Sequence, residues 1–208
     1  MNFKTEQEKF WAGDFGDDYI SRNKSEEYLA SNLNFFSKIF TRLNQPQSLI
    51  EFCANIGMNL RAIKLLFPNI HLSAVEINES AAAKLAEFIG REQVYNESIF
   101  DFDPVQKFDV SLIKGVLIHI NPEMLSQVYE KLYQSSNQYI LICEYYNPSP
   151  VAISYRGHDD RLFKRDFAGE MLEKYADLKL IDYGFCYKRD RAFPQDDITW
   201  FLLEKHKD

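Results

Sequence analysis

The chain has 208 residues, of which 46% are hydrophobic and 26% are charged, so it can bury a core without disulfides or a structural metal. Its 24 basic and 31 acidic residues give a net charge of −7, which argues against a general nucleic-acid binder, because such proteins present a basic face to phosphates. Cys53, Cys143 and Cys186 lie far apart in the sequence, so neither a zinc ribbon nor a disulfide framework is expected.

The sequence carries no sign of export or of a membrane segment. Its first residues lack a basic region followed by an apolar run, so we expect no signal peptide. No apolar stretch approaches the roughly 20 residues that a membrane helix needs. We therefore expect a cytoplasmic protein without a membrane partner. Neither repeats nor linkers divide the chain, which predicts a single domain over 1–208.

Helical signals open the chain. Thr5 and Glu8 have the spacing of a capping box and predict a short helix, which Gly13 and Gly16 are expected to break. Ser25 predicts the N-cap of a longer helix, because apolar residues follow it at helical spacing.

The segment 1–45 is expected to form a helical lid or cap. Its aromatic residues Trp11, Phe15 and Tyr19 allow two interpretations. They close over a bound ligand, as flanking segments of sequestered sites commonly do, or they dock the N-terminus on the sheet.

From Pro46 onward, strand patterns alternate with helical patterns. The expected strands lie near 48–53, 71–76, 93–95, 108–113, 139–143, 178–187 and 197–204, and the expected helices near 59–67, 79–89, 121–135 and 166–176. The last two strands are expected to form an antiparallel hairpin. This alternation predicts a Rossmann-like α/β fold, with a seven-stranded, mostly parallel sheet and helices on both faces.

The turn after the first strand and the acid that ends the second strand suggest a nucleoside site. Gly57 lies in that turn, and Glu76 ends the strand near 71–76. In doubly wound folds the backbone approaches the ligand at the first turn, and the acid binds the ribose hydroxyls. The turn lacks the three glycines of a dinucleotide site, and no lysine follows Gly57 as in a Walker loop. S-adenosylmethionine (SAM), which has no phosphate, therefore fits better. Taken singly, each residue allows an alternative without a ligand. Gly57 would then merely shape a tight turn, and Glu76 would be a solvated acid at the end of a strand.

Four segments carry a resemblance to a known family. They are Phe10-Trp-Ala-Gly-Asp-Phe-Gly-Asp-Asp-Tyr19, Glu51-Phe-Cys-Ala-Asn-Ile-Gly-Met-Asn-Leu60, Lys114-Gly-Val-Leu-Ile-His-Ile-Asn-Pro122, and Tyr145-Tyr-Asn-Pro-Ser-Pro-Val151 through Tyr155-Arg-Gly-His158. These segments resemble the pseudaminic acid biosynthesis-associated methylases, a family of class I SAM-dependent methyltransferases. The likeness covers nearly the whole chain. One departure is Cys53, where the family has glycine. A side chain at this position crowds the approach of the backbone to SAM.

The resemblance implies a set of cofactor-binding residues. They are Glu51, Cys53, Asn55, Gly57, Asn59, Glu76, Ile77, Ser98, Ile99, Phe100 and Lys114, joined by Trp11 and Tyr19 from the lid. Glu76 would hold the ribose, Ile77 and Phe100 would lie near the adenine, and Lys114 would face the methionine end.

Residues for the methyl acceptor are expected in the loop 144–165, because ligands of open α/β sheets bind beyond the carboxyl ends of the strands. Arg156 could clamp a carboxylate or phosphate, and His158 titrates in the range of a base. The candidate catalytic residues are His158, His119 and Tyr155, and the candidate substrate-binding residues are Tyr145, Tyr146, Asn147, Arg156 and Lys164. Alternatively, the loop is a solvated charged segment, and His119 only bridges backbone groups.

The leading hypothesis is a SAM-dependent methyltransferase that acts on a sugar-like small molecule, anionic sugars included. The resemblance points to a nonulosonic (pseudaminic) acid or a nucleotide-linked sugar, with in-line transfer to O or N and no metal. A second hypothesis is a SAM-binding regulator or scaffold without chemistry. A third is a nicotinamide oxidoreductase, which the missing glycines disfavour.

Overall fold

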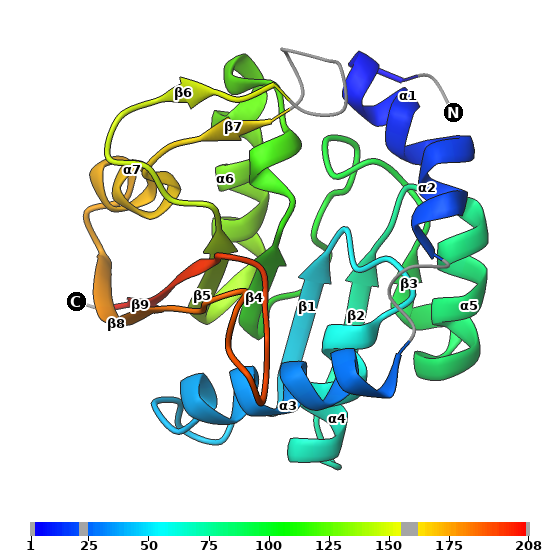
Figure 1. Ribbon diagram of the computed structural model, residues 1–208, viewed down its shortest axis with the longest axis horizontal. Helices are drawn as coiled ribbons and strands as arrows, with labels where there is room; N and C mark the ends of the chain where they lie inside the picture. The colour runs from blue at the N-terminus through cyan, green and yellow to red at the C-terminus, as the bar shows by residue number, and fades with distance from the viewer. Residues whose placement is uncertain (1–2, 21–24, 155–161, 207–208) are drawn as a thin grey trace.

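The computed structural model describes residues 3–20, 25–154 and 162–206. Its centre is a seven-stranded sheet in the order β3-β2-β1-β4-β5-β9-β8 (Figure 1). The strands are β1 (Ser48–Phe52), β2 (His71–Val75), β3 (Val94–Tyr95), β4 (Phe108–Lys114), β5 (Ser136–Glu144), β8 (Leu178–Phe185) and β9 (Thr199–Lys205). Strands β1 to β5 are parallel, whereas β9 is antiparallel to both β5 and β8. The predicted, mostly parallel sheet with a C-terminal hairpin is confirmed.

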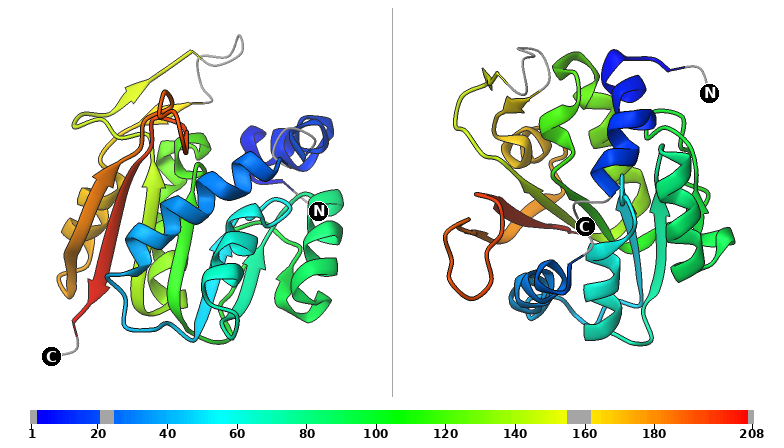
Figure 2. Two further views of the ribbon diagram at one scale, coloured as in Figure 1. Left: turned by 60° about the horizontal axis from the view of Figure 1, so that its bottom comes forward. Right: turned by 45° about the vertical axis from the view of Figure 1, so that its right-hand side comes forward.

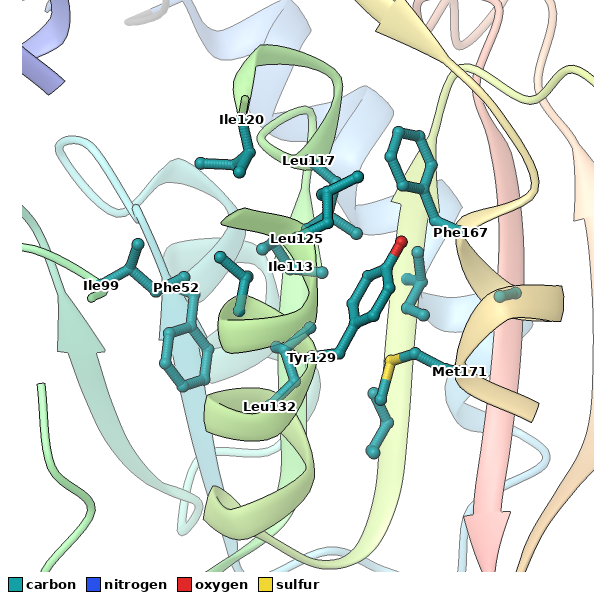
Figure 3. Packing of buried hydrophobic residues seen from close by; sticks show 14 of the residues in the cluster. Phe52, Ile99, Ile113, Leu117, Ile120, Leu125, Tyr129, Leu132, Phe167 and Met171 are labelled. Atoms are coloured by element: carbon teal, nitrogen blue, oxygen red, sulfur yellow. The ribbon is translucent and has the colours of Figure 1, made fainter. Parts of the chain in front are cut away.

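Helices cover both faces of the sheet, as predicted (Figure 2). One core layer lies under α3 (Glu26–Phe40), α4 (Met58–Leu66) and α5 (Glu79–Ile89). The other lies under α6 (Leu125–Ser135) and α7 (Phe167–Lys174), where Leu125, Tyr129, Leu132, Phe167 and Met171 pack on the sheet (Figure 3). Burial of these apolar side chains provides the main favourable free energy of folding.

Polar caps set where several helices begin. Ser25 accepts a hydrogen bond from the Tyr28 amide at the start of α3, and Asp166 accepts one from the Gly169 amide at the start of α7. The Ser25 cap was predicted, and the helix that Asp166 caps was expected near 166–176. Asn121 caps a short 3₁₀ turn, η3 (Pro122–Met124), and α6 begins only after that turn.

The prediction that Gly16 breaks a helix is wrong. The helix α1 (Glu6–Ala12) ends at Gly13, but Gly16 lies inside a second helix, α2 (Asp14–Ile20). A Cβ atom at Gly16 would lie 2.0 Å from the Trp11 carbonyl oxygen. Glycine is therefore needed here for close packing of the two helices rather than for ending one of them.

The loop after β5 contains a small antiparallel ladder that the sequence pattern did not predict. Strands β6 (Val151–Ala152) and β7 (Phe163–Lys164) pair with each other, and the Ile153 amide donates to the Leu162 carbonyl at 2.8 Å. Within the described ranges, no helix is long and apolar enough to cross a membrane.

The parallel strands direct their carboxyl ends toward one edge of the sheet. The helices α1 and α2 lie beyond this edge, over the side of β1 and β2 (Figure 1). The N-terminal segment, α1 and α2 together, thus covers the place where ligands of open α/β sheets bind.

Candidate functional site

A cavity lies at the carboxyl ends of β1, β2 and β4, beneath α1 and α2. It encloses about 1120 Å³, including the part that is open to solvent. Twelve of the predicted site residues line it: Trp11, Tyr19, Cys53, Asn55, Asn59, Glu76, Ile77, Ser98, Ile99, Phe100, Lys114 and His119. The structure thus brings together side chains from the N-terminal segment, from three strand ends and from the loop after β3.

The turn between β1 and α4 has an unusual backbone. Cys53 and Asn55 have φ angles of 56° and 52°, and Gly57 has a φ of 78°. Side chains rarely adopt this left-handed region. Gly57 does not line the cavity, and a Cβ atom there would lie 2.5 Å from Leu85 Cδ1. Its role in this turn is therefore the shape of the backbone.

Glu76 ties this turn to the next one. Its Oε2 accepts a hydrogen bond from the Asn55 amide at 2.7 Å, and its Oε1 accepts one from the Asn78 amide at 2.8 Å. Burial raises the pKa of Glu76, although these amides act in the opposite direction. The carboxyl group is fixed at the cavity wall by two backbone amides, so it is not a solvated strand-end acid.

Glu51 lies behind the cavity wall. Its Oε1 accepts a hydrogen bond from Asn59 Nδ2 at 2.6 Å, and burial raises its pKa to about 8. Glu51 Oε2 and Asn59 Oδ1 are both buried and have no hydrogen-bond partner among the described residues. A proton on Glu51 Oε2 would remove a buried charge that has no donor to balance it, which agrees with the raised pKa.

Lys114 is the lysine among the described residues of the cavity wall. Its Nζ lies 3.5 Å from the Tyr28 hydroxyl and 5.8 Å from the centre of the Phe35 ring. Burial lowers the pKa of Lys114, but the neighbouring Tyr28, Cys143 and Glu51 raise it by more, so its pKa lies above the ordinary value. The ammonium group is thereby held against α3, at the end of β4.

The N-terminal segment is fastened to the sheet by polar contacts. The Ser98 hydroxyl donates a short hydrogen bond to Glu8, whose other carboxyl oxygen accepts the Thr5 amide at 3.0 Å. Asn78 Nδ2 donates to Asp17 Oδ1 at 3.0 Å. These contacts cross from α1 and α2 to the loops after β2 and β3, and they hold the segment over the cavity.

Aromatic rings line the inner side of this segment. The Trp11 ring lies 5.1 Å from the His119 imidazole and 5.3 Å from the Tyr19 ring. Phe15 stacks on Phe10 at 4.1 Å instead of lining the cavity. Trp11 and Tyr19 therefore cover the cavity, whereas Phe15 packs within the segment.

Several cavity residues were not predicted. They are Thr5, Gln7, Glu8, Gly16, Tyr28, Ala54, Ile56, Met58, Asn78, Gly115, Val116 and Ile120. Thr5 and Glu8 carried a helix-capping signal only, and nothing in a local pattern distinguishes a capping carboxylate from one that also contacts Ser98. Asn78, two positions after Glu76, is both the N-cap of α5 and the contact to α2.

The predicted acceptor residues in the loop after β5 lie outside this cavity or outside the described residues. Tyr145, Tyr146, Asn147 and Lys164 do not line it. Lys164 Nζ lies 5.1 Å from the centre of the Tyr145 ring, so the two ends of the loop meet. Tyr155, Arg156 and His158 fall in the range 155–161, which the structure does not describe. Within the described ranges, no group of three or more His, Cys, Asp or Glu side chains could hold a metal ion.

No protein-family model and no curated protein sequence matches the chain. Solved structures do. The 1,6-didemethyltoxoflavin N1-methyltransferase of Burkholderia thailandensis, solved with 1,6-didemethyltoxoflavin and S-adenosylhomocysteine (SAH), superimposes with a TM-score of 0.74 at 18% identity, over 100% of this chain and 92% of that one. The sugar N-methyltransferase KedS8 from Streptoalloteichus gives a TM-score of 0.65 at 13% identity, over 94% of each chain.

A third match is longer than this protein. The mitomycin 7-O-methyltransferase gives a TM-score of 0.66 at 13% identity, and the match covers 97% of this chain but 61% of that one. Together these similarities show the fold, which is the Rossmann-like fold of class I SAM-dependent methyltransferases.

Proposed function

We propose that the protein is a SAM-dependent methyltransferase that acts on a small molecule. The observation that carries this proposal is the cavity at the carboxyl ends of β1, β2 and β4, with Glu76 fixed in its wall. This is the position at which open α/β sheets bind nucleosides.

The residues of the cavity suit SAM. Both Glu76 oxygens accept backbone amides, and a carboxylate, with about four lone-pair sites, can still accept a ribose hydroxyl. Ile77, Ile99 and Phe100 offer an apolar surface for an adenine ring. Gly115, with a φ of 69°, lines the cavity, and a Cβ atom there would meet nothing within 4 Å. The wall beside Lys114 is therefore open, as a ligand at the methionine end requires.

Bound SAM would supply a methyl group that its sulfonium already activates. The chain then has to align the acceptor with that methyl group and exclude water. Trp11 and Tyr19 cover the cavity, and His119 lines it next to Trp11. His119 is the described residue that we assign to the acceptor side, where an imidazole can take a proton from a hydroxyl or amine.

For the acceptor we propose a sugar of the nonulosonic acid type or a nucleotide-linked sugar, methylated on O or N. The resemblance of Tyr155-Arg-Gly-His158 to the pseudaminic acid methylases supports this choice. One structural neighbour, KedS8, is a sugar N-methyltransferase. Arg156 would pair with the acidic group of such a sugar, and His158 and Tyr155 are the further catalytic candidates.

Calorimetry with SAM and SAH, followed by a mass-shift assay on sugar acids and nucleotide sugars, tests the proposal. We expect binding of both compounds, and a product heavier by one methyl group. Replacing Glu76 by Ala should weaken SAM binding by about 100-fold, because the ribose loses its acceptor and two amides lose theirs. The control is Glu79→Ala, an exposed acid in the first turn of α5.

The outcomes separate the hypotheses. SAM binding without product in any acceptor assay would favour the regulator or scaffold. Failure to bind SAM or SAH, or equal SAM affinity in the Glu76→Ala and wild-type proteins, would overturn the cofactor assignment.

A further inference from the structure

Glu144 ends β5 and is 2% exposed. Its Oε1 accepts hydrogen bonds from the amides of Val116 and Leu117, both at 2.9 Å. These amides open the 3₁₀ turn η2 (Leu117–His119), whose own N-cap residue, Val116, provides no side-chain acceptor. A carboxylate from the neighbouring strand therefore caps η2 in place of a local side chain.

The turn η2 is the place where three parts of the site meet. Its last residue, His119, lines the cavity, and the Trp11 ring of α1 lies 5.1 Å from the imidazole. The strand β7 packs against η2 from the acceptor side. Gly115, with its φ of 69°, connects η2 to β4. The orientation of His119 thus depends on how the backbone of η2 is held.

We propose that Glu144 is a positioning residue, which fixes the His119 turn against the end of the sheet and so keeps the imidazole in place over the cavity. The structural part of this inference stands on the two hydrogen bonds. Its kinetic consequence rests on the proposed methyltransferase function.

The charge of Glu144 strengthens the anchor. Burial raises its pKa to about 7, although the amides of Val116, Leu117 and Ile118 and the charge of Lys114 oppose the shift. Among the described residues, the other titratable groups that interact with it are Tyr129 on α6, Cys53 after β1 and its neighbour Cys143. Hydrogen bonds to an ionised acceptor are roughly twice as strong as neutral ones. The anchor should therefore weaken as the pH falls through about 7.

The chain offers a matched control at the opposite end of the sheet. Asp109 Oδ2 accepts the amides of Gln47 and Ser48 at 2.7 and 3.2 Å, which is the same pattern of one carboxyl oxygen and two consecutive amides. The test compares Glu144→Gln, which keeps an acceptor but loses the charge, and Glu144→Ala, which loses both, with Asp109→Asn.

The first readout needs no acceptor. Amide correlation spectra of the whole protein should show the Val116 and Leu117 signals titrating near pH 7. This titration should vanish in Glu144→Gln and persist in Asp109→Asn, and the His119 imidazole signals should shift only in the Glu144 variants. Unmoved His119 signals in both Glu144 variants would overturn the proposal, whether or not methyl transfer has been found.

The second readout is kinetic, with the acceptor identified by the mass-shift assay. Glu144→Ala should lower kcat by roughly 100-fold, as expected for a small misplacement of a reacting group, while the Kd of SAH stays within about twofold. Glu144→Gln should recover part of kcat and lose the fall in activity below about pH 7. Wild-type kcat and pH profile in Glu144→Ala would refute the positioning role. Absence of turnover in the wild type would refute the proposed function instead, and the spectra would still decide the role of Glu144.

Discussion

Cys53 shows how a single residue can restrict a binding turn. Its φ of 56° lies in the left-handed region, which costs a side chain of the order of 1 to 3 kcal/mol, and the residue also lines the cavity. The backbone angle and the position of the side chain both favour glycine at position 53. Glycine would remove the strain of the positive φ angle and the crowding of the cavity. The sequence comparison with a family that has glycine here pointed to the crowding, but the φ angle became visible only in the structure.

We expect Cys53→Gly to tighten SAM binding and to stabilise the protein by about 1 kcal/mol, the relief of strain exceeding the loss of thiol packing. The measurements are calorimetry and urea unfolding. Cys53→Ala is the control, because it removes the thiol but keeps Cβ and the strain. If Cys53→Gly binds SAM more weakly than wild type, the turn does not approach the cofactor as we propose.

At the scale of elements, the helices α1 and α2 form a cover that depends on close packing. Gly16 allows α2 to approach the end of α1, and Asn78 fastens α2 to the start of α5. A side chain at position 16 would also lie 2.8 Å from Asn78 Nδ2. The two helices therefore cannot keep this packing if a larger residue replaces Gly16.

Gly16→Val should displace α2, expose the cavity and raise the Kd of SAM about tenfold, a loss of about 1.4 kcal/mol. Gly13→Ala provides the comparison, because a Cβ there lies 3.3 Å from the Lys9 carbonyl oxygen, which is tight but far from the 2.0 Å overlap at position 16. Calorimetry and the rate of proteolysis within α2 report the change. Equal SAM affinity in both variants would mean that α1 and α2 do not contribute to cofactor binding.

The elements were predictable where the sequence pattern is local. Strands β1, β2, β4 and β5 are short segments rich in apolar residues, and α3 has an apolar stripe with Ser25 as its cap, so the local sequence pattern identified them. The ladder of β6 and β7 has only two residues in each strand, too few for any periodicity. The prediction for Gly16 was wrong because this glycine allows close contact between α1 and α2. Local helix propensity carries no information about a contact between two helices.

The site was predictable along the strand ends, where fold topology fixes which residues meet. Glu76, Ile77 and Lys114 reach the cavity for this reason. The contact of Glu8 with Ser98 and the capping of η2 by Glu144 join residues 90 and about 28 positions apart. Nothing in a linear pattern distinguishes such carboxylates from exposed ones.

At the scale of the whole molecule, buried acids should govern stability. The pKa of Glu51 is raised to about 8, that of Glu144 to about 7, and that of Glu76 is also raised, all chiefly by burial. Between pH 4.5 and 8 the folded protein therefore binds more protons than the unfolded chain. By linkage, the stability that these groups provide is complete below their unfolded pKa and is lost as the pH rises through the folded values.

We predict that the free energy of unfolding falls by roughly 7 kcal/mol between about pH 5 and about pH 8.5, of which Glu51 contributes about 4 and Glu144 about 3. Urea unfolding at several pH values measures it. Glu51→Gln should flatten the dependence, because its amide stays neutral and can donate to the Asn59 Oδ1 that has no partner among the described residues. An unchanged slope in this variant would show that Glu51 is already ionised in the folded protein.

The strand order has a consequence for how the chain is made. Strand β9 lies between β5 and β8, although it follows both in the sequence. The half of the sheet that lines the cavity can assemble as soon as β5 has been synthesised, but β5 then presents an open edge of apolar residues, Tyr139 to Cys143, until β9 arrives. Unpaired apolar edges recruit strands from other chains. A chain that ends between β8 and β9 would thus keep the strands that line the cavity and would be prone to aggregate through β5.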